Sequence, residues 1–245
     1  MVKLIQSFIL FMCGFSAMTF SQEKVNSNSG FLDFNLYPIL SDVDGDSVVT
    51  INAAAKLSNR FSYFSLTYFY NQSDRGELED TAGFYTEQNL RWQIKNNSPL
   101  DLTAQYNLRS GVNNDRLRLG VRWRLNDTGA IKEFFETLSL QWSVNFHVLQ
   151  IDHSSDNAWQ IEHAFRLTMP YVSNRIYLAG FIDHTFNEDL SSGSNNIPNN
   201  PIVAEAQLGY RLIENLYVVT EYRVNQYRRD DVNNLALGIE YKIKW

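Results

Sequence analysis

The sequence predicts an all-β protein, a single antiparallel transmembrane β-barrel of about 12 strands. Three observations predict this fold: apolar and polar residues alternate along most of the chain, turn-forming segments recur at short intervals, and 14% of the residues are aromatic. Alternation with period two places the two kinds of side chain on opposite faces of a strand. Aromatic residues favour strands, and only 5 of the 245 residues are proline.

The chain begins with a segment that we interpret as a secretory signal. Lys3 precedes an apolar run that reaches Phe20, and the small and polar residues Ser21 and Gln22 follow. A spanning helix would need roughly 20 uninterrupted apolar residues, which this run does not have; a retained anchor is the alternative. We therefore assign residues 1–22 to a signal peptide, 23–29 to a short N-terminal segment and 30–245 to the barrel.

Export excludes several classes of protein. The one cysteine, Cys13, leaves with the signal peptide, so the mature chain is not a disulfide scaffold. Removing Lys3 leaves 20 of the 21 basic residues against 27 acidic ones, a net charge of 20 − 27 = −7. A nucleic acid is therefore not expected as a partner.

Candidate strands follow one another from residue 31 to the last residue, and turn-rich segments separate them. The expected strands cover residues 31–39, 47–57, 60–71, 83–95, 100–109, 115–125, 136–150, 158–170, 174–187, 202–212, 215–227 and 233–245. Counted in order, the odd-numbered connections tend to be longer and more polar, and the even-numbered ones are mostly tight. This alternation is typical of a transmembrane barrel, in which one rim has short turns and the other has longer loops.

The two faces of the strands differ in the way that a membrane barrel requires. In strand 115–125, four arginines lie on one face, and a dry core does not accept unpaired charges. The opposite, apolar face of the same strand consists of Leu117, Leu119, Val121, Trp123 and Leu125. All five tryptophans fall on apolar faces, as in the aromatic girdle of a membrane barrel; they are Trp92, Trp123, Trp142, Trp159 and Trp245. A soluble barrel with its apolar face inside is the alternative, because alternation alone does not separate inside from outside.

The end of the chain carries a further signal. Leu235, Leu237, Ile239, Tyr241, Ile243 and Trp245 share one face of the last strand. With a terminal aromatic residue and with Tyr241 and Ile243 at the matching positions, residues 30–245 resemble a Gram-negative outer-membrane β-barrel protein. The resemblance implies a location in the outer membrane, contact with outer-membrane lipid, and insertion by the barrel-assembly machinery, which reads the C-terminal strand. Barrels of this strand number include nucleoside-specific channels and outer-membrane phospholipase A.

If the apolar face contacts lipid, the other face lines a lumen, and its charges are unevenly distributed. Basic residues come from the fourth to sixth strands: Arg91, Lys95, Arg109, Arg116, Arg118, Arg122 and Arg124. Acidic residues come from the eighth to twelfth: Glu162, Asp183, Glu205, Glu221 and Glu240. Opposed walls of this kind select solutes by charge, whereas pairing through Arg166, Arg211 and Arg223 would fill the interior.

The predicted function is a narrow diffusion channel for small polar or anionic solutes. The candidate binding residues in its lumen are Arg91, Arg116, Arg118, Arg122, Arg124, Glu205, Glu221, Arg223 and Glu240. Of these, Arg91, Arg118 and Arg122 are expected to set an anion preference and to face Glu205, Glu221 and Glu240. Aromatic side chains available to stack on a flat solute in the lumen are Tyr63, Phe69, Tyr85 and Tyr217.

An enzyme is a second hypothesis. His153 and Ser155 form an H-x-S pair that resembles the base and nucleophile of outer-membrane phospholipase A and lipid A deacylase. The phospholipase has Asn-Gly-Arg after its serine, whereas Asp156, Asn157 and Ala158 stand here, so we predict no catalytic residue.

The remaining signals predict no cofactor and no metal. His147 is expected in the lumen and His163 at the membrane interface, while His184 and Asp183 face opposite ways. The segment SDVDGD resembles part of a calcium loop without its final glutamate. A third hypothesis is a structural or surface-interaction barrel, whose long loop 188–201 contacts a partner, or which pairs with a second copy or a lipoprotein.

Overall fold

The protein is described by a computed structural model that covers residues 29–40, 47–71, 81–111, 115–152, 158–188, 197–227 and 232–245. The predicted signal peptide and residues 23–28 lie outside these ranges, as do the SDVDGD segment and both members of the H-x-S pair. Those assignments therefore stay predictions.

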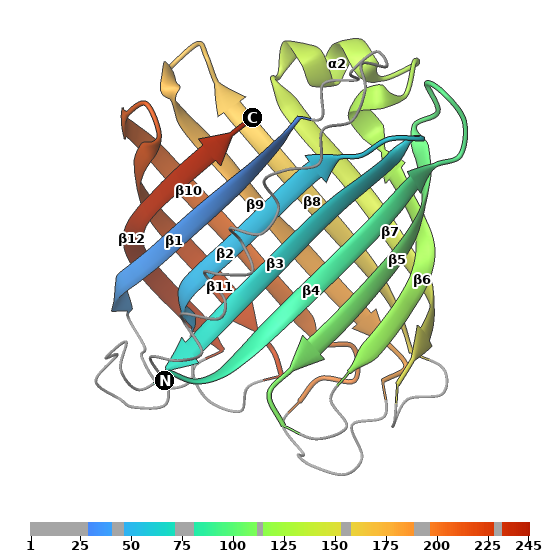
Figure 1. The fold of residues 1–245 in the computed structure, drawn as a ribbon, viewed down its shortest axis with the longest axis horizontal. Helices are drawn as coiled ribbons and strands as arrows, with labels where there is room; N and C mark the ends of the chain where they lie inside the picture. Colours follow the sequence, from blue (N-terminus) through green and yellow to red (C-terminus); the bar gives the residue numbers. More distant parts are fainter. Residues whose placement is uncertain are drawn as a thin grey trace, which may run out of the picture.

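Twelve strands form the fold, each within a few residues of the range expected from the sequence. They are β1 (Gly30–Leu40), β2 (Ser47–Lys56), β3 (Phe61–Asn71), β4 (Thr81–Gln93), β5 (Leu100–Arg109), β6 (Arg116–Arg124), β7 (Leu140–Ile151), β8 (Trp159–Met169), β9 (Ser173–Phe186), β10 (Ile202–Ile213), β11 (Leu216–Asn225) and β12 (Asn233–Lys244). Each pairs antiparallel with its neighbours in the chain, and β1 pairs with β12 to close the barrel (Figure 1).

The closure joins the two ends of the barrel domain. The amide of Gly30 donates to the carbonyl of Trp245 at 3.0 Å, and the amide of Trp245 donates back at 3.2 Å. A closed sheet has no edge strand, so its backbone groups need no water at membrane depth. The last strand therefore completes the barrel, as the alternation in its sequence predicted.

The two rims of the barrel differ in which connections they contain and in how long these connections are. The connections β2–β3, β4–β5, β6–β7, β8–β9 and β10–β11 meet at one rim together with Gly30 and Trp245, and we call it the short-turn rim. The other six connections form the long-loop rim, which includes the described residues Glu188 and Tyr227. Figure 1 shows the C-terminus and helix α2 at the same end of the barrel. The even strand count and the sorting of connections by parity are as predicted.

The β6–β7 connection departs from prediction. The expected strand 136–150 begins only at Leu140, because a 3₁₀ turn η2 (Leu125–Asp127) and a helix α2 (Lys132–Thr137) precede it. Helix α2 buries Phe135 and leaves Phe134 exposed. Six residues give too short a periodic pattern to identify a helix beforehand. None of the helices in the described part of the chain is both long and apolar enough to span a bilayer.

The barrel is apolar outside and polar inside. Large apolar residues on the outer face are well exposed, for example Leu102 at 46% and Leu237 at 43%. Polar residues on the inner face are buried, for example Gln105 and Glu240 at 1% each. This distribution is the reverse of that in a soluble barrel, and it fits a surface solvated by lipid. The described barrel therefore crosses a membrane, and the soluble alternative is excluded.

The tryptophans follow the two rims of this surface. Trp92, Trp123, Trp142 and Trp245 lie within three residues of strand ends at the short-turn rim, and Trp159 begins β8 at the long-loop rim. Their indole rings lie on the outward face in the strand register. They thus form the predicted aromatic girdle.

Candidate functional site

The barrel encloses a cavity of about 1690 Å³. Its lining includes Lys56 and Lys244 at the short-turn rim and Glu188 and Tyr227 at the long-loop rim. One cavity therefore extends along the whole lumen. A volume of this size accommodates a small hydrated solute.

All of the candidate binding residues predicted from the sequence line this cavity. They are Arg91, Arg116, Arg118, Arg122, Arg124, Glu205, Glu221, Arg223 and Glu240. Lys95, by contrast, lies exposed in the β4–β5 turn. Acids also stand on the expected basic wall, at Glu87 and Asp101, and cations on the expected acidic wall, at Arg166 and Lys242. The charges are therefore not sorted into two opposed walls.

Charge is instead sorted along the barrel axis. Cations that line the cavity near the short-turn rim, which we call the short-turn mouth cations, are Lys56, Arg60, Arg91, Arg122, Arg124, Lys132, Arg166, Lys242 and Lys244. The acids that line the same part of the cavity are Asp33, Asp101, Asp127 and Glu240, which contacts Lys242. The cations thus outnumber the acids at this mouth, which gives it a positive field.

Some of the short-turn mouth cations are neutralised by ion pairs. Asp101 lies 2.5 Å from Arg122 Nη2 and 3.4 Å from Arg124 Nη1, and Asp127 lies 2.8 Å from Arg124 Nε. Lys242 Nζ lies 3.2 Å from Asp33 and 2.5 Å from Glu240. These pairs fix the geometry of the mouth and reduce its net charge.

Three arginines of the mouth have aromatic rather than acidic neighbours. Arg60 lies over Trp92, with its guanidinium 4.8 Å from the ring centre, and donates to the carbonyl of Ile94. The other two are Arg91 and Arg166. The guanidinium of Arg91 lies 5.5 Å from the ring centre of Phe64, and that of Arg166 lies 4.2 Å from the ring centre of Tyr177. Within the described ranges neither forms an ion pair, and Arg91 Nε is buried without a hydrogen-bond partner. A cation over an aromatic face keeps its charge available to a solute. Arg91 and Arg166 therefore supply uncompensated positive charge.

The acids in the middle of the lumen accept hydrogen bonds from tyrosines. Tyr68 on β3 donates to Glu205 Oε2 on β10 at 2.6 Å, and this bond crosses the lumen because four strands lie between β3 and β10. Tyr37 likewise donates to Glu221 Oε2 at 2.7 Å, and Arg223 Nε lies 2.7 Å from the other oxygen of Glu221. The bond from Tyr68 crosses the lumen, and all of these side chains narrow it. The sequence analysis had left open such a partial filling of the interior.

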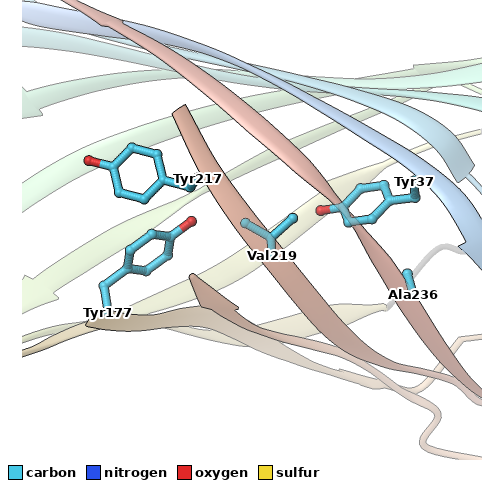
Figure 2. Packing of buried hydrophobic residues seen from close by; sticks show 5 residues of the cluster. All are labelled: Tyr37, Tyr177, Tyr217, Val219 and Ala236. Carbon is cyan, nitrogen blue, oxygen red and sulfur yellow. The ribbon is translucent and has the colours of Figure 1, made fainter. Parts of the chain in front are cut away.

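A hydrophobic cluster occupies one side of the interior. Figure 2 shows Tyr37, Tyr177, Tyr217, Val219 and Ala236, which come from β1, β9, β11 and β12. The rings of Tyr177 and Tyr217 meet edge to face, with their centres 5.6 Å apart. The hydroxyl of Tyr177 donates to Gln207 Oε1 at 2.8 Å and to Glu240 Oε2. The hydroxyl of Tyr177 in this cluster therefore bonds to Gln207 and Glu240, two polar side chains that line the cavity.

Gly209 makes room for this arrangement. It pairs directly with Tyr177 across β9 and β10, and a Cβ atom at position 209 would lie 2.2 Å from Tyr177 Cε1. The tyrosine ring thus covers a glycine on the neighbouring strand, a pairing known to support sheets.

Replacing Gly209 with alanine is expected to destabilise the barrel by about 1–3 kcal/mol, because the added methyl displaces Tyr177 and its bond to Glu240. The measurement is urea unfolding of the barrel in lipid vesicles, followed by tryptophan fluorescence. Gly129→Ala is the matched control, since a Cβ there meets nothing within 4 Å. Equal stability of the two variants would contradict the proposed packing.

A chain of side chains crosses the long-loop mouth. Arg116 Nη2 on β6 lies 2.6 Å from Glu188 Oε1, just after β9, and the hydroxyl of Tyr227, just after β11, donates to Glu188 Oε2. Burial and the nearby Glu188 carboxylate raise the pKa of Tyr227 to about 12, so this hydroxyl keeps its proton at neutral pH. Because β6 and β11 stand five strands apart, Arg116, Glu188 and Tyr227 form a bridge over the mouth, which we call the mouth bridge.

Two of the aromatic residues expected in the lumen have the parity of the outer face. Phe69 pairs with Phe84 and lies outside the lumen, whereas Tyr63 pairs with Leu90 but also borders the cavity. Tyr85 and Tyr217 point inward as predicted. In β3 both faces mix aromatic and polar residues, so the alternation did not identify the inner one. The inward aromatics of this strand are Phe64, Tyr68 and Tyr70.

The described histidines are dispersed. His147 is fully buried in the lumen, with Nε2 3.3 Å from Glu162 Oε2. His163 lies on the outer face, where it accepts a bond from the indole of Trp142 at 3.2 Å, and His184 points outward, away from Asp183. These placements agree with the expectations from the sequence.

The comparisons with known proteins found a fold but no family. No protein-family model and no curated protein matches the chain. Among solved structures, a NanC porin has a TM-score of 0.52 at 10% identity, over 89% of this chain and 100% of the porin. The chain shares the fold of the NanC porin. That likeness confirms the predicted class of barrel.

Two further solved structures resemble the chain more weakly. A KdgM porin has a TM-score of 0.47 at 12% identity, over 87% of this chain and 98% of the porin. A KdgM porin in complex with disordered oligogalacturonate has a TM-score of 0.48, with the same identity and coverage.

Proposed function

We propose that the protein is a diffusion channel of the outer membrane for small polar solutes, with a preference for anions. The observation that supports this most is the cavity that reaches both rims and passes the short-turn mouth cations. A water-filled path with a positive mouth raises the local concentration of anions and repels cations.

The proposed anion preference depends mainly on Arg91 and Arg166. Of the arginines predicted for this role, Arg118 donates to Gln105 and Gln150 at 3.0 and 2.7 Å, and Arg122 is paired with Asp101. Their charge is partly engaged within the wall. Arg91 and Arg166 form no ion pair among the described residues, although the charge of Arg91 also acts on Glu162, so more of their charge is open to an anion in the bore.

The test is single-channel recording of the refolded chain in a planar bilayer, after heat-modifiable gel mobility has confirmed a folded barrel. We expect conductance steps, and under a potassium chloride gradient a reversal potential displaced toward the chloride equilibrium potential. Galacturonate oligomers, with one carboxylate per sugar, are a suitable anionic test solute and are expected to reduce the chloride current. A folded barrel that never conducts would overturn the proposal.

The partners implied by the resemblance belong to the same proposal. Tyr241, Ile243 and Trp245 are exposed on the outer face of β12, where lipid or the barrel-assembly machinery can contact them. A second copy is supported by polar side chains on the outer face of β3 and β4. There, Thr67 and Thr86 lie 2.9 Å apart and Gln88 donates to Thr86 at 2.6 Å. Hydrogen-bonding side chains in a lipid-facing surface favour association between spanning elements.

A further inference from the structure

The connection between β6 and β7 leaves the barrel wall on its lipid side. Trp123, an outward residue of β6, donates its indole N–H to Thr128 Oγ1 at 2.7 Å. Asn126 Oδ1 accepts the backbone N–H of Trp142, an outward residue of β7, at 3.2 Å. Both tryptophans belong to the aromatic girdle, and such girdles lie where the lipid head groups meet water. Helix α2, which this connection contains, therefore stands beside the membrane interface.

Helix α2 directs its apolar side chains away from the lumen. Successive residues of an α-helix are rotated by about 100° around its axis. Lys132 borders the cavity, and Phe135, about 300° further round, is the buried residue of the helix. Phe134 lies about 200° from Lys132, and Leu138 lies about 240° from it. These two apolar side chains thus share one face, which lies opposite the bore and next to the direction in which Phe135 is buried.

The polar side chains of α2 occupy the other face. Glu136 and Glu133 lie about 40° and 100° from Lys132 on the same helix. The Nζ atom of Lys132 lies 3.5 Å from Glu136 Oε1, one turn along the helix. A helix that separates a charged face from an aromatic and aliphatic one lies flat in a membrane interface, with the apolar face toward the acyl chains.

The apolar face of α2 is open in the described part of the chain. Phe134 is 61% exposed and Leu138 is 43% exposed, which is as much as the strand residues that contact lipid. The ring of Phe134 meets that of Phe135 edge to face, with the centres 5.4 Å apart. Phe135 thus supports the exposed ring from the protein side and leaves its outer side uncovered.

We propose that α2 is an interfacial anchor, in which Phe134 and Leu138 insert among the lipids at the short-turn rim. The bonds from Trp123 and Trp142 make this face continuous with the lipid-facing surface of β6 and β7, so the same lipid layer covers both. A six-residue helix is too short to be stable alone, but α2 is held by the strands at both of its ends. The anchor fixes Lys132, on the opposite face, beside the mouth of the cavity.

The test is fluorescence quenching in phosphatidylcholine vesicles, which does not depend on conduction. Cys13 is the only cysteine of the chain, so Cys13→Ser gives a cysteine-free background. Phe134→Cys and Glu133→Cys are made in it, one on each face of α2, and labelled with bimane. We expect lipids with a nitroxide near the head group to quench the label at position 134 at least about twofold more strongly than the label at position 133. Iodide in the water should quench in the reverse order.

Two further variants complete the measurement. Leu138→Cys repeats the test on the apolar face with Phe134 in place, and it should behave as Phe134→Cys does. Leu237→Cys, on the outer face within β12, reports full lipid contact and calibrates the quenching. Equal access of iodide to positions 133, 134 and 138 would overturn the proposal, because the helix would then stand in water. Protection of positions 134 and 138 from both quenchers would overturn it as well, because protein rather than lipid would then cover the face.

Discussion

Replacing both Arg91 and Arg166 with serine is expected to reduce the anion preference of the channel strongly. The ratio of chloride to potassium permeability should fall about threefold or more, because two inward charges without an ion pair are removed, while the ion pairs of the mouth and the rim cations Lys56, Arg60 and Lys244 remain. The measurement is the reversal potential of single channels under a potassium chloride gradient.

The structure offers two comparisons for this result. Arg175→Ser removes an arginine at the same rim that does not line the cavity, and it should leave the reversal potential unchanged. Arg122→Ser should have a smaller effect than Arg91→Ser, because Asp101, 2.5 Å away, already engages the charge of Arg122. If the double variant keeps the wild-type ratio, the mouth cations do not set the selectivity.

The sequence predicted the strands well because each one carries its own signal. In β6 the arginines and the apolar residues separate completely by parity, so both its position and its inner face followed from the pattern. β3 has the same period but aromatic residues on both faces, and there the inner face was misassigned at Tyr63 and Phe69. Alternation thus locates a strand more reliably than it orients one.

The sequence could not predict which side chains bond to each other across the lumen, and the reason is geometric. The bond from Tyr68 to Glu205 joins residues 137 positions apart on strands that are not neighbours. Which residues meet there depends on the tilt and stagger of all the strands between them, and no local pattern contains these quantities. The sequence therefore placed the nine candidate residues in the lumen but not their pairs, and it missed the tyrosines that bind the acids.

The second large expected effect is a change in conductance when the mouth bridge is removed. Glu188→Ala removes the acceptor that Arg116 and Tyr227 share, so both side chains lose the contact that holds them over the long-loop mouth. We expect the single-channel conductance to rise roughly twofold, because the bridge spans the mouth between β6 and β11, which four strands separate, and narrows the path of every ion. Recordings in symmetric potassium chloride measure this directly.

Two variants separate removal of the bridge from removal of a charge. Tyr227→Phe keeps the charge and the ring but breaks one arm of the bridge, and it should raise the conductance by less than Glu188→Ala does. Glu214→Gln removes an exposed acid from the β10–β11 turn at the opposite rim and should leave the conductance unchanged. Because Asp152 lies 3.7 Å from Arg116 Nε, Arg116 retains one acidic neighbour after Glu188 is lost. A wild-type conductance in Glu188→Ala would mean that solutes already pass beside the bridge, and the narrowest point would then lie deeper, where Tyr68 reaches Glu205.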